Sequence, residues 1–161
     1  MSHNQVLIIL NGEDQSILSK ESNKIILAKK NIENITQNHT FLQTNFESLE
    51  ELIKANEIIR SRFSNIDDLI IVNKDIDLNM ISYQYDYIHI KQNYQELMNI
   101  IYFINLLIPL LKSEFRFILS LEKDNHYKVH FNNFKMSLIN YLTSLKKDLV
   151  NSNNIKIKIL S

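Results

Sequence analysis

Residues 131–160 read FNNFKMSLINYLTSLKKDLVNSNNIKIKIL and join two different hydrophobic patterns. In the first part, apolar residues recur every three or four positions, which is typical of an amphipathic helix that buries one face. These residues are Phe131, Phe134, Leu138, Tyr141, Leu142, Leu145 and Leu149. After a polar turn, isoleucines alternate with lysines over residues 155–160, which is the period of a β-strand. The stretch therefore predicts a helix, a turn and a strand in that order, as in a parallel α/β sheet.

Five earlier segments also have the short apolar or alternating pattern of strands. They are residues 5–10, 24–29, 40–46, 66–74 and 115–121. Helices are predicted after the third of these strands, over residues 48–63, and after the fourth, over residues 88–112. Ser48 and Glu51 have the spacing of a capping box at the start of the first helix. The pattern alone predicts a parallel sheet with right-handed crossovers.

The composition excludes several classes of protein. The 161 residues correspond to one domain, and 18 basic residues balance 18 acidic ones, so no net charge favours nucleic acid or an anionic membrane. The absence of cysteine excludes disulfides, thiol nucleophiles and cysteine metal sites. The apolar run at residues 6–10 is too short for a secretory signal, which predicts a cytoplasmic or organelle-matrix protein. The single glycine and single proline are typical of an AT-biased coding genome.

The order of these segments resembles the short-chain dehydrogenase/reductase family, in particular its classical 3-oxoacyl-ACP reductases. In that family Tyr-x-x-x-Lys opens a helix that is followed by a turn and the next parallel strand. Here Phe131 stands at the tyrosine position, and Lys135 is the retained lysine. The resemblance implies a single Rossmann-like domain over residues 1–161. It would be a three-layer sandwich with a parallel sheet of about six strands, shortened N-terminal helices, and neither the C-terminal lid nor the seventh strand.

The positions that bind the cofactor in the resembled family are largely changed. Its Thr-Gly-x-x-x-Gly-x-Gly motif corresponds to NGEDQSIL at residues 11–18, which keeps only Gly12. Glu13 and Asp14 place negative charge where a phosphate would lie, which is unfavourable for an anion site at a helix start. Asn45 stands where an aspartate contacts the adenine, although a turn or capping role explains it equally well. Asn73 falls within the replaced Asn-Asn-Ala-Gly motif, so Gly12, Asn45 and Asn73 are weak candidates for cofactor binding.

Two lysines, Lys29 and Lys30, follow the second predicted strand. A basic residue at this place in the resembled family favours the cofactor with a 2′-phosphate, whereas a solvated strand end needs no ligand. No bound cofactor is expected with so many positions changed, and NAD(P) would bind only if the site is functional.

The catalytic positions are changed as well. In the resembled family the tyrosine is the proton donor, the lysine lowers its pKa and holds the nicotinamide ribose, and a serine steadies the substrate oxygen. Phe131 has no proton to give, and general acid catalysis contributes roughly a hundred- to ten-thousand-fold. The catalytic asparagine position falls at Glu96, and Ser120 is displaced from the serine position. The alternative is a residual NAD(P)-dependent ketoacyl or enoyl reductase that uses Tyr127, eight residues before Lys135, as the substitute acid.

A metal site has weak support. His126 and His130 are four residues apart, and Glu122 or Asp124 is a conceivable third ligand. No established zinc pattern matches, so these residues are interpreted as surface residues, and no metal is predicted.

The predicted helix over residues 88–112 points to a protein partner. Residues 97–111 are apolar on nearly all sides but shorter than the roughly 20 residues that a membrane span needs. A helix of this kind must be covered on every side. In the resembled family this helix and the one bearing Lys135 build a dimer interface. We therefore expect a catalytically inactive structural or interaction subunit, which pairs through helices 88–112 and 131–150 with a copy of itself or a paralogue.

Overall fold

The structure is a computed structural model that describes residues 3–11, 22–30, 38–73, 87–121, 129–148 and 156–160. Its elements are β1 (Asn4–Asn11), β2 (Asn23–Ala28), β3 (His39–Gln43), α1 (Leu49–Arg62), β4 (Ile66–Asn73), α2 (Tyr87–Leu107), the 3-10 turn η3 (Ile108–Leu110), β5 (Leu111–Leu121), α3 (Val129–Asp148) and β6 (Lys156–Leu160).

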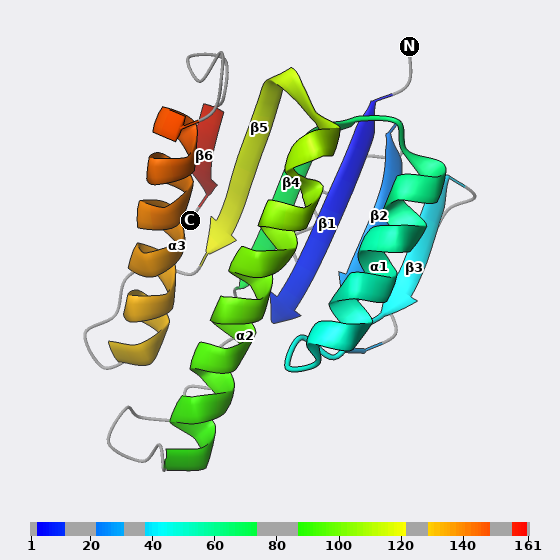
Figure 1. Cartoon of the computed structure of the whole chain (residues 1–161). Helices are drawn as coiled ribbons and strands as arrows, with labels where there is room; N and C mark the ends of the chain where they lie inside the picture. The colour runs from blue at the N-terminus through cyan, green and yellow to red at the C-terminus, as the bar shows by residue number, and fades with distance from the viewer. Residues whose placement is uncertain are drawn as a thin grey trace.

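The six strands form one sheet in the order β3-β2-β1-β4-β5-β6, and every neighbouring pair is parallel. This is the strand order of the doubly wound dinucleotide-binding fold. Helices α1, α2 and α3 all cover the same face of the sheet (Figure 1). The predicted Rossmann-like α/β class is therefore confirmed, whereas the shortened N-terminal helices fall at residues 12–21 and 31–37, outside the described residues.

The central strand β1 is buried on both faces, as its continuous apolar run predicts. Val6 and Ile8 pack in the larger core cluster, between the sheet and the three helices. Leu7 points the other way and packs with Ile26 and Ile70 in a smaller cluster on the opposite face. Strand alternation therefore assigns each residue of the sheet to one of two faces.

One of the two hydrogen bonds of the predicted capping box is present at the start of α1. The Glu51 backbone N–H donates to the Ser48 side-chain oxygen at 3.3 Å. The Glu51 carboxylate does not return to the Ser48 N–H; it accepts from the Asn45 backbone N–H, also at 3.3 Å. The helix therefore connects to the end of β3 as well as to its own first turn.

Four predicted boundaries were wrong by two residues or more, including the start of β5, which is Leu111 and not residue 115. Helix α2 ends at Leu107, because Pro109 has no backbone N–H and clashes with a continuing helix, so residues 111–112 begin β5 instead. Strand β3 ends at Gln43 rather than residue 46, since Asn45 accepts a hydrogen bond from the Glu47 N–H at 3.0 Å and starts a turn. Helix α3 begins at Val129, two residues early. Within the described ranges no helix is long and apolar enough to cross a membrane.

Candidate functional site

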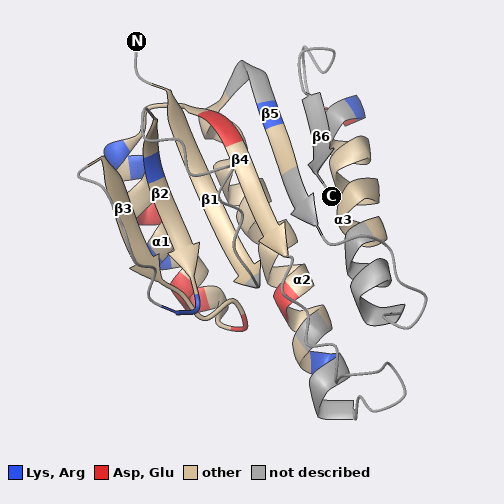
Figure 2. Cartoon of the chain, turned by 180° about the vertical axis from the view of Figure 1, so that it is seen from behind, with Lys and Arg blue, Asp and Glu red and all other residues tan. Residues whose placement is uncertain are grey.

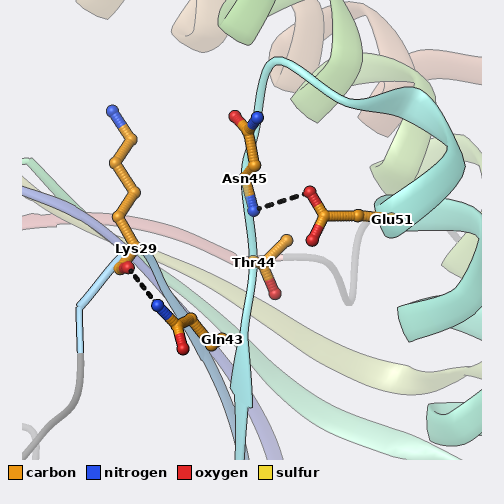
Figure 3. Close-up of a pocket in the computed structure, with 5 residues that line it drawn as sticks. All are labelled: Lys29, Gln43, Thr44, Asn45 and Glu51. Atoms are coloured by element: carbon orange, nitrogen blue, oxygen red, sulfur yellow. Dashed lines mark hydrogen bonds between the residues drawn. The ribbon is translucent and has the colours of Figure 1, made fainter.

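A pocket of about 430 Å³ lies where β2 and β3 end and α1 begins (Figure 3). It is lined by Lys29, Gln43, Thr44, Asn45 and Glu51. Ligands of open α/β sheets bind outside the carboxyl ends of the strands, so this is the edge at which the fold would hold a ligand. We call it the carboxyl edge.

Two hydrogen bonds join residues of the described lining to one another, and both are long. Gln43 donates from its side-chain amide to the Lys29 carbonyl at 3.3 Å, and the Asn45 N–H donates to Glu51 at the same distance. In Figure 3 the side chains of Lys29 and Asn45 extend toward the same side. The Asn45 side-chain oxygen is used by the turn at Glu47, so the turn role that competed with the adenine-contacting role is present here.

An ion pair connects this edge to α2. The Lys29 ammonium lies 2.5 Å from a carboxylate oxygen of Glu96, whose side chain is only 13% exposed. The resemblance places the catalytic asparagine at Glu96, so an acidic group that neutralises Lys29 stands at that position. A nucleotide phosphate would have to compete with Glu96 for Lys29. Glu96 is the only acidic residue in the sequence of α2, and this was the available sequence signal for the pair.

Asn73 lies at a different part of the same edge. It ends β4, is paired in register with Asn11 of β1 and Leu121 of β5, and is buried. The strand order reverses between β1 and β4, which is the topological switch point where doubly wound folds bind ligands. The structure therefore places Asn73 at the centre of the edge and Asn45 on its β3 side, with β1 and β2 between them.

The remaining predicted site residues are described only in part. Phe131 and Lys135 lie in the first half of α3, and their side chains are outside the described part of the chain. Gly12 and Tyr127 lie outside the described residues, as do His126, Glu122 and Asp124. The described residues contain no group of three His, Cys, Asp or Glu side chains that could hold a metal ion. The catalytic arrangement stays a prediction.

Solved structures with the same fold are found among reductases. The chain is similar to a short chain dehydrogenase family protein from Francisella tularensis, with a TM-score of 0.76 and 13% identity over 99% of this chain and 68% of that one. The fold is that of the short-chain dehydrogenases and reductases. A Leptospira borgpetersenii short chain dehydrogenase solved with bound NAD+ has a TM-score of 0.71 and 13% identity, over 99% of this chain and 71% of its own.

A third structure with this reductase fold is the 3-ketoacyl-(acyl-carrier-protein) reductase from Brucella melitensis complexed with NADH. Its TM-score is 0.69 at 13% identity, over 96% of this chain and 75% of its own. Neither a protein-family model nor a curated protein matches the chain. The resemblance inferred from the sequence is therefore confirmed at the level of the fold.

The opposite edge of the reductase fold holds a buried polar network. In register order, Lys24 of β2, Gln5 of β1, Asp68 of β4 and Arg116 of β5 form a row across the sheet. Each stands two residues from a member of the smaller core cluster, so all lie on the face away from the helices. Figure 2 shows this row as charged bands near the amino ends of β2 and β4 and across β5. We call this the amino edge.

Asp68 is the centre of the network. It is completely buried, and the Arg116 guanidinium donates to both of its oxygens, at 2.7 and 2.9 Å. Gln5 donates at 2.7 Å, and His3 Nε2 lies 2.6 Å from the same carboxylate. Burial alone would raise the pKa of Asp68, but the hydrogen bonds from Arg116, His3 and Gln5 outweigh it and hold the pKa below its usual value.

Lys24 completes the row on the β2 side. Its ammonium donates to the Gln5 side-chain oxygen at 2.5 Å, and the side chain is almost fully buried. Burial lowers the pKa of Lys24, and the charge of Asp68 partly opposes that change. Sequence reasoning missed the whole row: Arg116 is the one member with an apolar neighbour on each side, and Gln5 and Lys24 stand at the polar starts of their strands.

Proposed function

We propose that this chain is a non-catalytic protein with the reductase fold, which acts as a structural or interaction subunit by pairing with a second copy through the outer faces of α2 and α3. The observation that carries the proposal is a row of exposed large side chains on α2. Tyr94, Met98 and Tyr102 follow one another at four-residue intervals and are 37%, 63% and 46% exposed. Residues four apart lie on one face of a helix.

This face of α2 carries no charge. Between Tyr94 and Leu107 the only charged residue is Glu96, and its carboxylate is paired with Lys29. By contrast, α1 exposes Glu50, Lys54 and Glu57, as is usual for a solvated helix. A second copy would therefore meet no like charges when two α2 helices pack in an isologous contact.

Helix α3 extends the same surface. It lies beside α2 on the helical side of the sheet (Figure 1), and Met136 on α3 is 51% exposed. A standard interface buries about 800 Å² on each partner, which is more area than Tyr94, Met98 and Tyr102 can supply by themselves. The 21 residues of α2 extend over roughly 30 Å, so two neighbouring helices of this length are large enough for such an interface.

The changed site positions support the non-catalytic part of the proposal. Phe131 carries no proton for a carbonyl oxygen, and Gly12 is the only glycine available for close approach to a pyrophosphate. Glu96 forms an ion pair with Lys29, a basic residue that lines the pocket at the carboxyl edge. Together they support a protein whose fold was retained while its reductase chemistry was lost.

Sedimentation velocity over a range of concentrations tests the pairing. The wild type is expected to be a dimer, and Tyr102→Lys or Met98→Lys should shift it to monomer by placing like charges opposite each other. Ile53→Lys is the matched control, because Ile53 is a large, 38% exposed side chain on α1. A wild type that stays monomeric at all concentrations refutes the pairing, and so does equal dissociation by the control. A complex with a different protein but not with a copy would favour the paralogue.

The second candidate is a residual NAD(P)-dependent oxidoreductase that uses Tyr127 and Lys135. It is favoured by the pocket at the carboxyl edge, which lies where doubly wound folds bind their ligands. The Leptospira borgpetersenii and Brucella melitensis proteins of the same fold were solved with NAD+ and NADH. Nucleotide binding separates the two candidates, because a subunit that only pairs has no need of a dinucleotide.

A further inference from the structure

A second cavity, of about 380 Å³, lies at the amino edge, at the other end of the strands from the carboxyl-edge pocket. It is formed by the starts of β1, β2 and β3 and by the chain that leaves α1. Its polar lining includes Asn4, Asn23, Lys24, Asn38, Thr40 and Arg62. A volume of this size suits a small molecule of a few functional groups, because ligand pockets are typically about 300–1,000 Å³.

Among the described residues that line this cavity, the charged ones have one sign. Lys24 and Arg62 are basic, and the described part of the lining contains no aspartate or glutamate. One Arg62 nitrogen donates to the Thr40 hydroxyl at 2.5 Å. Among the described residues, no carboxylate lies within ion-pair distance of Arg62. Its positive charge is therefore not compensated within the described part of the cavity.

Two nearby features oppose an anion, and neither forms an ion pair with Arg62 among the described residues. The carboxyl end of α1 carries roughly half a negative charge, which the full charge of Arg62 in its last turn exceeds. Asp67 accepts from the Asn4 backbone N–H at 2.8 Å, and its charge contributes to raising the pKa of Arg116. Asp67 therefore lies in the field of another guanidinium and does not neutralise Arg62.

The neutral part of the lining supplies donors with fixed positions. The Asn4 side-chain amide donates to the Asn65 carbonyl at 3.0 Å, and the Asn23 amide donates to the Asn4 side-chain oxygen at 3.3 Å. These bonds orient the asparagine side chains beside the cavity before any ligand arrives. Prearranged amides and hydroxyls beside a guanidinium are the groups that bind carboxylates and phosphates.

We propose that the amino-edge cavity binds a small oxyanion, the carboxylate or phosphate group of a small molecule, with the Arg62 guanidinium as the main contact. Asn23, Asn38 and Thr40 supply neutral hydrogen-bonding groups around it, and Lys24 lines the inner wall, where the nearby Asp68 carboxylate partly offsets its charge. The site is separate from the carboxyl edge and from the outer faces of α2 and α3, so it does not depend on the proposed pairing.

Thermal unfolding and titration calorimetry of the full chain with inorganic phosphate and with succinate, each against chloride at equal ionic strength, test the site. A ligand that binds the folded state raises the unfolding temperature in a saturable way. Arg62→Gln should weaken binding about tenfold or more, as expected for loss of a charge-assisted hydrogen bond. Arg62→Lys should restore part of the affinity. Lys54→Gln makes the same charge change on the same helix away from the cavity and should have no effect.

The outcomes are distinct. Saturable binding that Arg62→Gln weakens and Lys54→Gln preserves supports the site, and the stronger of the two probes identifies phosphate or carboxylate as the preferred group. Backbone amide resonances of Asn23, Asn38 and Thr40 should then shift on titration. The proposal is wrong if neither anion binds in the millimolar range, if both variants weaken binding equally, or if the shifts fall at the carboxyl edge instead.

Discussion

The two edges of the sheet differ in how completely their polar side chains are bonded. At the amino edge, buried Asp68 takes part in four hydrogen bonds of 2.6 to 2.9 Å. At the carboxyl edge, the two bonds between residues of the pocket lining are 3.3 Å long. Among the described residues, the charged group of Lys29 is paired with Glu96 alone, and Lys29 and Asn45 are exposed. The fold would hold a ligand at the carboxyl edge, yet the best-ordered polar chemistry lies at the other. The comparison indicates that hydrogen bonds fix the polar side chains of the amino edge more firmly than those of the carboxyl edge.

The largest expected effect comes from breaking the amino edge at its centre. Asp68→Ala should lower the free energy of unfolding by about 3–5 kcal/mol, because the buried Gln5 amide and the Arg116 guanidinium lose the carboxylate to which they donate. Urea unfolding followed by circular dichroism measures this change. Asp67→Ala is the neighbouring control and should cost clearly less, because Asp67 is only half-buried. Equal losses for the two variants would contradict the central position of Asp68.

The pH dependence of stability should follow the same carboxylate. The folded-state pKa of Asp68 is lowered, so its contribution to stability is fully present above the unfolded-state pKa of about 3.9. That contribution is lost as the pH falls through the lower, folded-state pKa. Urea midpoints measured from neutral to acidic pH should therefore fall less steeply for Asp68→Asn than for the wild type. Parallel curves would show that other carboxylates account for the acid sensitivity.

The smallest expected effect is at the carboxyl edge. Glu96→Gln removes the ion pair with Lys29, whose side chain is 38% exposed, and should cost about 1 kcal/mol or less. A double-mutant cycle with Lys29→Met in urea unfolding isolates the coupling between the two groups. A coupling larger than the loss in Asp68→Ala would reverse the comparison between the edges.

Local signals in the sequence were sufficient for most of the fold. The continuous apolar run of β1, the Ser48 cap and the alternating pattern of β6 all depend on near neighbours in the chain, and each lies within one residue of its predicted place. The end of α2 was also readable, because Pro109 cannot continue a helix, but the apolar pattern on both sides of it concealed the change to β5.

Cross-strand features were not readable in the same way. Gln5, Lys24, Asp68 and Arg116 are far apart in sequence, and only the strand register brings them into one row. The Lys29–Glu96 pair depends likewise on the packing of α2 against the sheet. Helical spacing also predicts that Leu49 and Ile53 share the buried face of α1 with Leu52, Ile59 and Phe63. That prediction is wrong at two positions, since Leu49 and Ile53 are exposed while Ala55 and Asn56 are buried. Spacing identifies a helix, but the exact direction of its buried face is set by tertiary packing.

The central claim of the proposed function is that the chain has the reductase fold but does not bind a dinucleotide at its carboxyl edge. Fluorescence titration of the wild-type chain with NADH and NADPH tests this most directly. The Asp68→Asn variant, which is expected to be less stable, is titrated in parallel, because a signal that comes from partial unfolding would be larger in this variant. The account predicts no saturable binding of either nucleotide in the micromolar range. Micromolar binding of NADH or NADPH to the folded wild type would contradict it and would favour a residual oxidoreductase.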